Sequence, residues 1–283
     1  MMQIKRGFVD VQEGQMHYRT CGSSDGSSLP LVMLHGGGGT SKFLEPLMQQ
    51  LGRGGSLIAF DQLGNGDSSA PAPAQPDVAY FADSVMRALD GMQMQRFDLY
   101  GWHTGANLAI EMAVNHPGRI RKLILDGVPL RTDAENAEQL AHYAPVVPIT
   151  DFGSQFLWAW HFARDRFLFT KYYQKKRTGQ RDVEFPNAEE LHDITMEVLK
   201  GIRTYHLAYH ASFRYRKVER LKLISMPTLI TAAATDPIFG HADRVVALIP
   251  GATKAPNQGT ATEAAAKETA SLFAAFLEQL KVE

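Results

Sequence analysis

The feature that most restricts the fold is a series of short apolar runs, each followed by a segment with helical spacing. Continuous apolar runs at residues 31–34 and 57–60 suit strands that are buried on both faces. The series continues with a predicted helix at 78–89, a strand at 97–100, a helix at 106–114 and a strand at 123–125. Repeated strand–helix units predict an α/β fold with a mostly parallel central sheet and helices on both faces.

Two further regions extend this pattern at the ends of the chain. Residues 8–11 and 16–20 alternate around the turn Glu13-Gly14, which predicts an opening hairpin, and a second turn is expected at 21–28. Near the C-terminus we expect a strand at 227–232, a helix at 241–248, a weak strand at 253–255 and an amphipathic helix at 272–280.

The strand–helix alternation breaks between residues 131 and 220. This stretch predicts several helices and is crowded with aromatic side chains. We therefore expect an α/β core made of residues 1–130 and 221–283, interrupted by a helical cap at residues 131–220.

Composition narrows the class of partner. The 283 residues carry a formal net charge of -1, which gives no electrostatic reason to expect nucleic acid or a membrane as a partner. Neither a signal-peptide core nor a membrane-spanning run is found, so we expect a cytoplasmic protein with a small-molecule substrate. A homodimer is left open. Cys21 is the only cysteine, which excludes intrachain disulfides and cysteine-rich zinc sites, and we expect neither metal nor cofactor.

A run of glycines follows the first core strand. The strand ends in His35, and Gly36, Gly37, Gly38 and Gly39 come directly after it. Glycines let the backbone approach a ligand closely and turn its N–H groups toward it. The run lacks the lysine of a phosphate-binding P-loop and the spaced glycines of a dinucleotide fingerprint, so a nucleotide site is disfavoured.

A second motif follows the strand at 97–100. Gly101 and Gly105 flank His103 in the sequence YGWHTG, and small residues are required at those positions because the turn from strand to helix is tight. Together with the glycine run and the loop FDQLGNGDS at 60–68, this segment resembles the nucleophile elbow of the α/β-hydrolase superfamily, whose members include epoxide hydrolases, C–C hydrolases and esterases.

The resemblance implies an oxyanion hole made by the backbone amides of Gly37 and Thr104, with His35, Gly36 and Gly38 as further ligand-binding residues of the same loop. It also implies an acid at Asp236, with Asp126 as second choice. The chain departs from the family in two ways. His103 stands where the family places serine, and no histidine follows His241. The loop in which the family carries its catalytic histidine contains instead Asn257, Gln258, Gly259 and Thr260.

These departures lead to a hypothesis about His103. At the elbow its imidazole would point toward the site centre, oriented by Asp236 or Asp126, and would act as general acid or base, or as nucleophile, opposite the oxyanion hole. Such a site suits ester or lactone opening, C–C cleavage, decarboxylation or isomerisation of a small apolar carbonyl compound. Two alternatives remain: a ligand-binding pseudoenzyme, and a hydrolase whose base comes from the cap, from His142, His161, His206 or His210.

Some side chains are candidates for binding the substrate. Trp102 at the elbow points to an apolar, aromatic ligand. In the insertion, Trp160 and Arg164 share one helical face, and His161 and Asp165 form the next such pair. Arg164 could bind a carboxylate or carbonyl group, whereas an ion-paired helix surface is the structural alternative.

Overall fold

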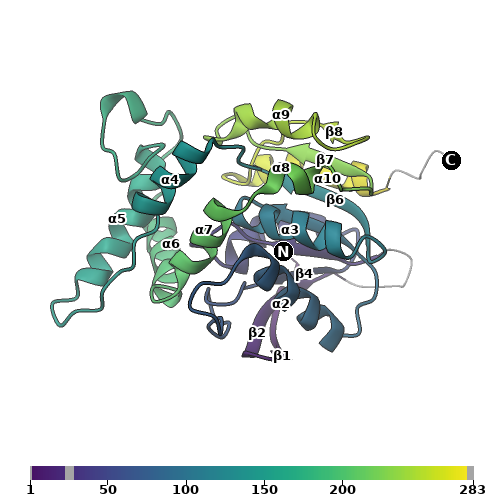
Figure 1. Ribbon diagram of the computed structural model, residues 1–283, viewed down its shortest axis with the longest axis horizontal. Coiled ribbons are helices and arrows are strands. Elements are labelled where there is room, and N and C mark those ends of the chain that lie inside the picture. Colours follow the sequence, from purple (N-terminus) through teal and green to yellow (C-terminus); the bar gives the residue numbers. More distant parts are fainter. Residues whose placement is uncertain (1, 23–28, 279–283) are drawn as a thin grey trace.

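The central sheet has eight strands in the order β1-β2-β4-β3-β5-β6-β7-β8 (Figure 1). The computed structural model describes residues 2–22 and 29–278. β1 and β2 run antiparallel to their neighbours, and the remaining pairs are parallel. The strands are β1 (Lys5–Val11), β2 (Gly14–Cys21), β3 (Leu31–Leu34), β4 (Leu57–Phe60), β5 (Phe97–Trp102), β6 (Ile120–Asp126), β7 (Thr228–Thr231) and β8 (Thr253–Lys254). This confirms the predicted α/β class and its mostly parallel sheet.

Helices cover both faces of the sheet. α2 (Val78–Gly91), α3 (Thr104–Asn115) and α9 (Ala242–Val246) share one hydrophobic cluster with the sheet, whereas α1 (Glu45–Leu51) and α10 (Glu263–Glu278) share the cluster on the other face. A 3₁₀ turn at Ser41–Leu44 precedes α1, and another at Phe239–His241 precedes α9. In the part of the chain that the structure describes, no helix is both long and apolar enough to cross a membrane.

Five helices lie between β6 and β7, in the region where the sequence predicts an insertion. They are α4 (Asp133–His142), α5 (Ser154–Leu168), α6 (Ala188–Lys200), α7 (Tyr205–Arg214) and α8 (Lys217–Leu221), with a 3₁₀ turn at Arg177–Gly179. Figure 1 shows α4, α5 and α6 grouped at one end of the molecule. Aromatic side chains of the insertion form a separate buried cluster that includes Phe162 of α5, Tyr172 of the segment after α5, and Tyr205 and Tyr209 of α7.

The insertion is joined to the sheet layer by its last two helices. α7 contacts α2 and α3, and α8 contacts α3. Ala208 and Ala211 of α7, with Leu221 of α8, belong to the same hydrophobic cluster as the sheet. α7 thus links the aromatic cluster to the helix that begins at the elbow.

Several element ends differ from the sequence-based expectations. α10 begins nine residues earlier than expected, because the alanine-rich stretch after Glu263 has a high helix propensity but no large apolar side chains to mark its buried face. The expected helix at 241–248 is shorter, since His241 belongs to the 3₁₀ turn. Most of the expected turn at 21–28, and residues 279 and 280 of the last helix, lie outside the described residues.

Candidate active site

His103 sits at a strained turn between β5 and α3. Its backbone has φ 50° and ψ -107°, a left-handed region that non-glycine residues rarely adopt. The turn is tight because α3 passes close to β3: a β-carbon added at Gly105 would lie 2.3 Å from the carbonyl oxygen of Leu34. A β-carbon at Gly101 would lie 2.5 Å from the carbonyl oxygen of Gly105. Sterics therefore account for both glycines of the motif.

The imidazole of His103 is paired with Asp236. Its Nε2 donates to Oδ2 of Asp236 at 2.6 Å, and 34% of the His103 side chain is exposed against 10% of Asp236. Within the described residues Nδ1 makes no hydrogen bond, so it is the ring nitrogen left for a ligand. Trp102 lies beside the ring, with 5.0 Å between the ring centroids. The structure brings together three of the residues singled out in the sequence.

Burial and charge act in opposite directions on this pair. Burial disfavours the charged imidazolium, but the charge and the hydrogen bond of Asp236 outweigh that effect and raise the pKa of His103 above 6.5. Burial likewise opposes ionisation of Asp236, yet His103 and the N–H of Ile238 hold its pKa below 3.8. The ionised carboxylate of Asp236 therefore stabilises the protonated form of His103 relative to a free imidazole.

Asp126 has a different role from Asp236. Its Oδ2 accepts from the Tyr100 hydroxyl at 2.9 Å, and its Oδ1 accepts from the Asn257 amide at 3.1 Å. Burial, reinforced by the charge of Asp236, raises the pKa of Asp126 to about 7. Asn257 also donates to Thr231 at 3.1 Å. In the family this loop carries a histidine. Here it carries Asn257, whose side-chain amide hydrogen-bonds to residues at the ends of both β6 and β7.

Gly127 makes room for the His103 ring. A β-carbon at this position would lie 2.4 Å from Cδ2 and 2.6 Å from Nε2 of His103, and the backbone has φ +66°. Sequence reasoning missed this residue, although its place directly after the end of β6 was a readable signal.

We expect Gly127→Ala to displace the imidazole from Asp236. Turnover should fall by about tenfold or more, because small misplacements of a catalytic group cost that much. Gly251→Ala is a matched control: its φ is +69°, with nothing within 4 Å of an added β-carbon. In both variants a residue with a β-carbon must adopt a positive φ, which lowers the free energy of unfolding by about 1–2 kcal/mol. Steady-state kinetics and urea unfolding check this, and equal turnover in the two variants would contradict the placement of the ring.

The glycine loop lies against the elbow and against α7. A β-carbon added at Gly37 would be 2.7 Å from the Thr104 hydroxyl oxygen and 2.7 Å from the Tyr209 ring. The Tyr209 hydroxyl donates to the Gly37 carbonyl at 2.6 Å. Neither the Gly37 nor the Thr104 N–H makes a hydrogen bond with a described residue. Gly36 faces Trp102 and His103, and Gly38 faces Phe162 and Tyr209.

His35 is fully occupied in supporting this loop. It is completely buried, its Nδ1 donates to the Gly36 carbonyl at 2.7 Å, and its Nε2 accepts from the N–H of Gln62 at 3.1 Å. Burial lowers its pKa. The expectation that His35 contacts a ligand is therefore corrected: both ring nitrogens are used within the protein.

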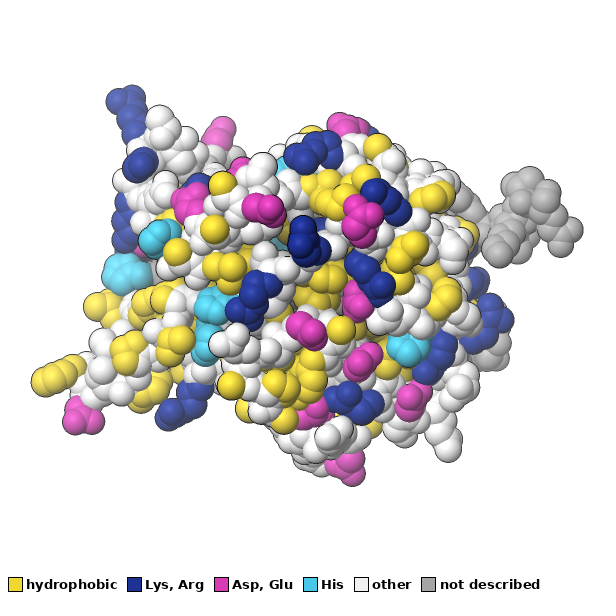
Figure 2. Space-filling model, viewed as in Figure 1, with side chains coloured by type: hydrophobic (Ala, Val, Ile, Leu, Met, Phe, Trp, Pro, Cys, Tyr) yellow, Lys and Arg dark blue, Asp and Glu magenta, His cyan; other side chains and the backbone are white. Residues whose placement is uncertain are grey.

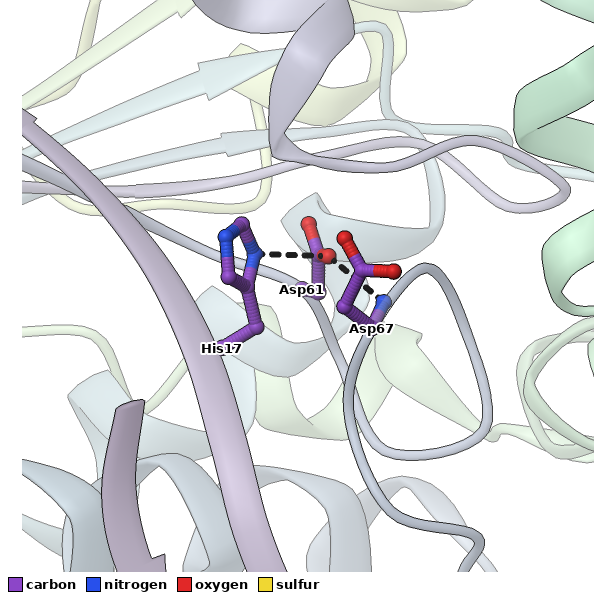
Figure 3. Close-up of side chains that lie close together, drawn as sticks. All are labelled: His17, Asp61 and Asp67. Atoms are coloured by element: carbon purple, nitrogen blue, oxygen red, sulfur yellow. Dashed lines mark hydrogen bonds and ion pairs between the residues drawn. The ribbon is translucent and has the colours of Figure 1, made fainter. Parts of the chain in front are cut away.

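The loop at 60–68 is built around Asp61 (Figure 3). The Asp61 carboxylate accepts from the N–H and hydroxyl of Ser41 at 2.7 and 2.6 Å, from His17 Nδ1 at 2.9 Å and from the N–H of Asp67 at 3.0 Å. These donors overcome the effect of burial and hold its pKa far below 3.8. His17, Asp61 and Asp67 are close enough to share a cation. Because protein donors already surround Asp61, we assign the group a structural role.

The candidate binding residues of α5 face away from the elbow. Phe162 lies 3.2 Å from a β-carbon built at Gly38, and positions two apart on a helix lie on nearly opposite sides, which places Trp160 and Arg164 on the far side. Arg164 donates to Asp165 at 2.8 Å. This contact agrees with the alternative stated for Arg164 in the sequence analysis, that it belongs to an ion-paired helix surface and does not bind a ligand. The expected pairing of His161 with Asp165 is replaced by the contacts of Asp165 with Arg164 and Lys175.

Arg166 shares the Phe162 side of α5. Its guanidinium lies 4.4 Å from the Phe162 ring centroid, and its Nε is buried without a hydrogen-bond partner among the described residues. Arg181 donates to the carbonyls of Arg166 at 2.6 Å and Thr235 at 3.0 Å, and its charge helps lower the pKa of Asp236. Sequence reasoning missed Arg166 because only the packing of α5 shows which of its faces is turned inward, and it missed Arg181 because that residue lies in a segment without regular spacing.

The other histidines of the insertion have contacts of their own. His210 donates to the Ala144 carbonyl at 2.8 Å, and its ring lies 5.6 Å from that of His206. His142 lies against Tyr173 with 5.7 Å between the ring centroids. No hydrogen bond described by the structure joins His142, His161, His206 or His210 to His103 or Asp236.

Two hydrolases of known name resemble this chain over part of its length. A 2-hydroxymuconate semialdehyde hydrolase of Pseudomonas sp. (strain CF600) is 35% identical over 112 residues, which are 38% of this chain and 40% of that protein. The 2-hydroxymuconate semialdehyde hydrolase of Pseudomonas putida is 30% identical over 118 residues, which are 39% of this chain and 40% of the relative. The matched stretch thus spans about two fifths of these relatives.

Solved structures match over nearly the whole chain. The enol-lactonase from Burkholderia xenovorans LB400 superposes with a TM-score of 0.73 and 16% identity, covering 96% of this chain and 100% of that one. A hydrolase from Pseudomonas aeruginosa PA01 superposes with a TM-score of 0.73 and 19% identity, covering 97% of this chain and 99% of that one. The sequence pattern of the alpha/beta hydrolase fold family matches residues 30–258. The chain belongs to the alpha/beta hydrolase fold family.

Proposed function

We propose that the protein is a cofactor-independent enzyme that opens a small ester or lactone with water, using His103 and Asp236 as its acid–base pair. The observation that carries this proposal is the 2.6 Å hydrogen bond between His103 Nε2 and Asp236, which leaves Nδ1 free at the elbow. An imidazole oriented by a buried carboxylate is the arrangement that general-base catalysis requires.

The reaction uses each ring nitrogen for a separate purpose. Nδ1 of neutral His103 accepts a proton from water while the water oxygen attacks the substrate carbonyl. The resulting oxyanion is stabilised by the N–H groups of Gly37 and Thr104, which have no acceptor among the described residues and belong to residues that pack against each other. When the carbon–oxygen bond to the leaving group breaks, the imidazolium returns the proton to the departing alkoxide. Asp236 remains ionised throughout.

The helical insertion at 131–220 forms the cap in this proposal and supplies the binding surface. Phe162 and Tyr209 give it an apolar wall next to Gly38, and Trp102 lies beside the catalytic ring. Arg166 carries a buried Nε without a described partner on the same side of α5. We therefore infer a substrate with an apolar body and one carboxylate. The two hydrolases of Pseudomonas, which are named for 2-hydroxymuconate semialdehyde as their substrate, are consistent with this inference.

A panel of paired substrates tests the proposal. Each pair consists of an ester, lactone or β-keto acid with a carboxylate and the same compound as its uncharged amide. We expect turnover of the carboxylate-bearing ester or lactone, and a higher KM for the amide. Absence of turnover for every compound, with binding retained, would favour the pseudoenzyme. A fluorophosphonate probe for serine nucleophiles should leave the protein unlabelled, and labelling at the active site would contradict the proposal.

Asp236→Asn should change the pH dependence as well as the rate. His103 acts as a base only when neutral, and Asp236 raises its pKa, so the wild-type rate should rise with pH through a value above 6.5. Removing the negative charge lowers the pKa of His103, so the rise of the rate with pH should occur at lower pH than in the wild type. The plateau of kcat should fall by about tenfold or more, because the imidazolium formed in the reaction loses its stabilising partner.

The profile of kcat/KM against pH for wild type and Asp236→Asn measures this shift. Asp243→Asn is the control, because Asp243 is an exposed aspartate that pairs with Lys254 on the surface. If kcat/KM rises over the same pH range in Asp236→Asn as in the wild type, His103 is ruled out as the titrating base.

A further inference from the structure

A second polar site lies at the base of the helical insertion. One of its lining residues, Arg131, is close enough to the active-site pair for its charge to act on His103 and for the charge of Asp236 to act on it. A cavity of about 520 Å³ is lined by residues of two segments, 129–140 and 213–219, which are the two chain connections between the insertion and the sheet layer. We name it the hinge pocket. Its lining does not include His103, Asp236, Gly37 or Thr104.

The charged side chains of the hinge pocket are mainly basic. Its charged lining residues are Arg131, Arg214, Arg216, Lys217, Asp133 and Glu219. None of the four basic side chains forms an ion pair or a side-chain hydrogen bond with any residue that the structure describes. Figure 2 shows Lys and Arg side chains over α7 and α8 on this face, with acidic side chains among them. The pocket therefore has an excess of positive charge. The negative charges of Glu135 and Asp236 act on Arg131 without forming an ion pair with it.

Lys217 is the informative member of this group. Only 5% of the residue is exposed, yet its ammonium has no hydrogen bond or ion pair with a described residue and lies 5.7 Å from the Tyr215 ring centroid. Burial, with the neighbouring charge of Arg131, lowers the pKa of Lys217 to about 8. At neutral pH it is still mostly charged. An unpaired buried ammonium is costly, and an anion bound beside it would remove that cost.

The remaining lining indicates what kind of anion fits. Leu130, Leu140, Phe213 and Val218 supply apolar surface on both connecting segments. The volume of about 520 Å³ is in the range of sites for small organic ligands and well above the size of one inorganic anion. A ligand with a charged end and an apolar body matches both properties of the pocket.

We propose that the hinge pocket binds a small organic carboxylate, whose charged group lies between Lys217 and Arg131 and whose apolar body lies against Leu130 and Phe213. The carboxylate accepts charge-assisted hydrogen bonds from the two cations. Because the lining comes from both connections of the insertion, an occupant contacts both of them at once.

Isothermal titration calorimetry with benzoate as the probe tests the proposal, with benzamide as its uncharged counterpart and inorganic phosphate as an anion without an apolar body. We expect benzoate to bind and benzamide to bind at least about tenfold more weakly, since it cannot form the charge-assisted hydrogen bonds. Equal binding of benzamide would overturn the charge assignment. Binding of phosphate alone would overturn the organic carboxylate, and absence of benzoate binding would overturn the site.

Variants place the binding in the hinge pocket. Lys217→Met keeps the length of the side chain and removes its charge, so benzoate affinity should fall by about tenfold or more. Lys222→Met is the matched control, because Lys222 caps the same helix but pairs with Glu219. Arg131→Gln should also weaken binding, which gives a second variant if Lys217→Met is poorly folded. Unchanged affinity in both pocket variants would overturn the proposal.

One further arm separates the hinge pocket from the candidate active site. His103→Ala should bind benzoate as tightly as wild type, because His103 does not line the pocket. Loss of binding in this variant would assign benzoate to the active site and contradict the proposal. Proton uptake adds an independent readout: near pH 8 an anion beside Lys217 favours the charged ammonium, so binding should take up protons, measured in two buffers of different ionisation enthalpy.

Discussion

His103→Ala is expected to lower kcat by about 100-fold to 10,000-fold, the range that a positioned general acid or base contributes. The substitution removes the only imidazole at the elbow and leaves the backbone amides of Gly37 and Thr104 in place. Substrate binding should therefore persist, with a dissociation constant close to that of the wild type. Loss of turnover with retained binding would distinguish a catalytic His103 from a residue that only shapes the pocket.

The control for this experiment is His142→Ala. His142 is exposed at the end of α4 and its ring packs on Tyr173. Its loss should leave kcat within about twofold of the wild type, as expected of a side chain that takes no part in proton transfer. Steady-state kinetics on the best panel substrate and equilibrium binding measure both variants. An unchanged rate in His103→Ala, or an equal loss in His142→Ala, would remove His103 from the mechanism.

Asp61→Asn is expected to destabilise the folded protein by about 3 kcal/mol, because it replaces one oxygen of a buried carboxylate with an amide nitrogen that faces N–H donors. The carboxylate is 1% exposed and accepts from Ser41, His17 and the N–H of Asp67. The effect acts on folding and not on the reaction. It should appear as a loss of unfolding free energy in urea at neutral pH.

The pH dependence of this contribution has a definite sign. The pKa of Asp61 is lower in the folded protein than its ordinary value of 3.8, so the stabilisation is fully present above that value. It is lost as the pH falls below 3.8 toward the native pKa. Asp67→Asn is the control: its side chain is 35% exposed and pairs with Lys200, which is worth less than about 1 kcal/mol. Equal losses in the two variants would contradict the structural role of Asp61.

Local sequence patterns predicted β3 and β4 well, because a strand buried on both faces is a continuous run of apolar residues. The continuous apolar runs at β3 and β4 have the same bounds in the sequence and in the structure. The start of α10 was harder to predict, because Ala264, Ala265 and Ala266 favour a helix by propensity but lack the large apolar side chains that mark a buried face. The α9 region was misread for a similar reason: no local signal separates a 3₁₀ turn from the first turn of an α-helix.

The candidate site was only partly readable, because its members come together through packing. The elbow motif gave His103 and its glycines, and the end of a strand gave Asp236. Tyr209 reaches the glycine loop from the insertion, and a contact between such distant segments leaves no local pattern. The periodicity of α5 showed which residues share a face but not which face is turned inward, so Arg164 was singled out in place of Arg166.

The same limit applies to Lys217. A lysine in KVERL predicts an exposed helix position, since lysine is rarely buried without a partner. Only the packing of α8 on α3 shows that its ammonium is buried. Buried charge is a property of the tertiary structure, and for this reason the hinge pocket could not be predicted from the sequence.

The account depends most on the state of one imidazole, which nitrogen-15 NMR of the histidine rings measures directly. Spectra of ¹⁵N-histidine-labelled wild type between pH 5 and pH 9, with His103→Gln to assign the signals, give both the tautomer and the pKa of His103. The account predicts that neutral His103 carries its proton on Nε2, facing Asp236, and titrates above 6.5. A proton on Nδ1, or a pKa below 6.5, would contradict the acid–base pair on which the proposed reaction depends.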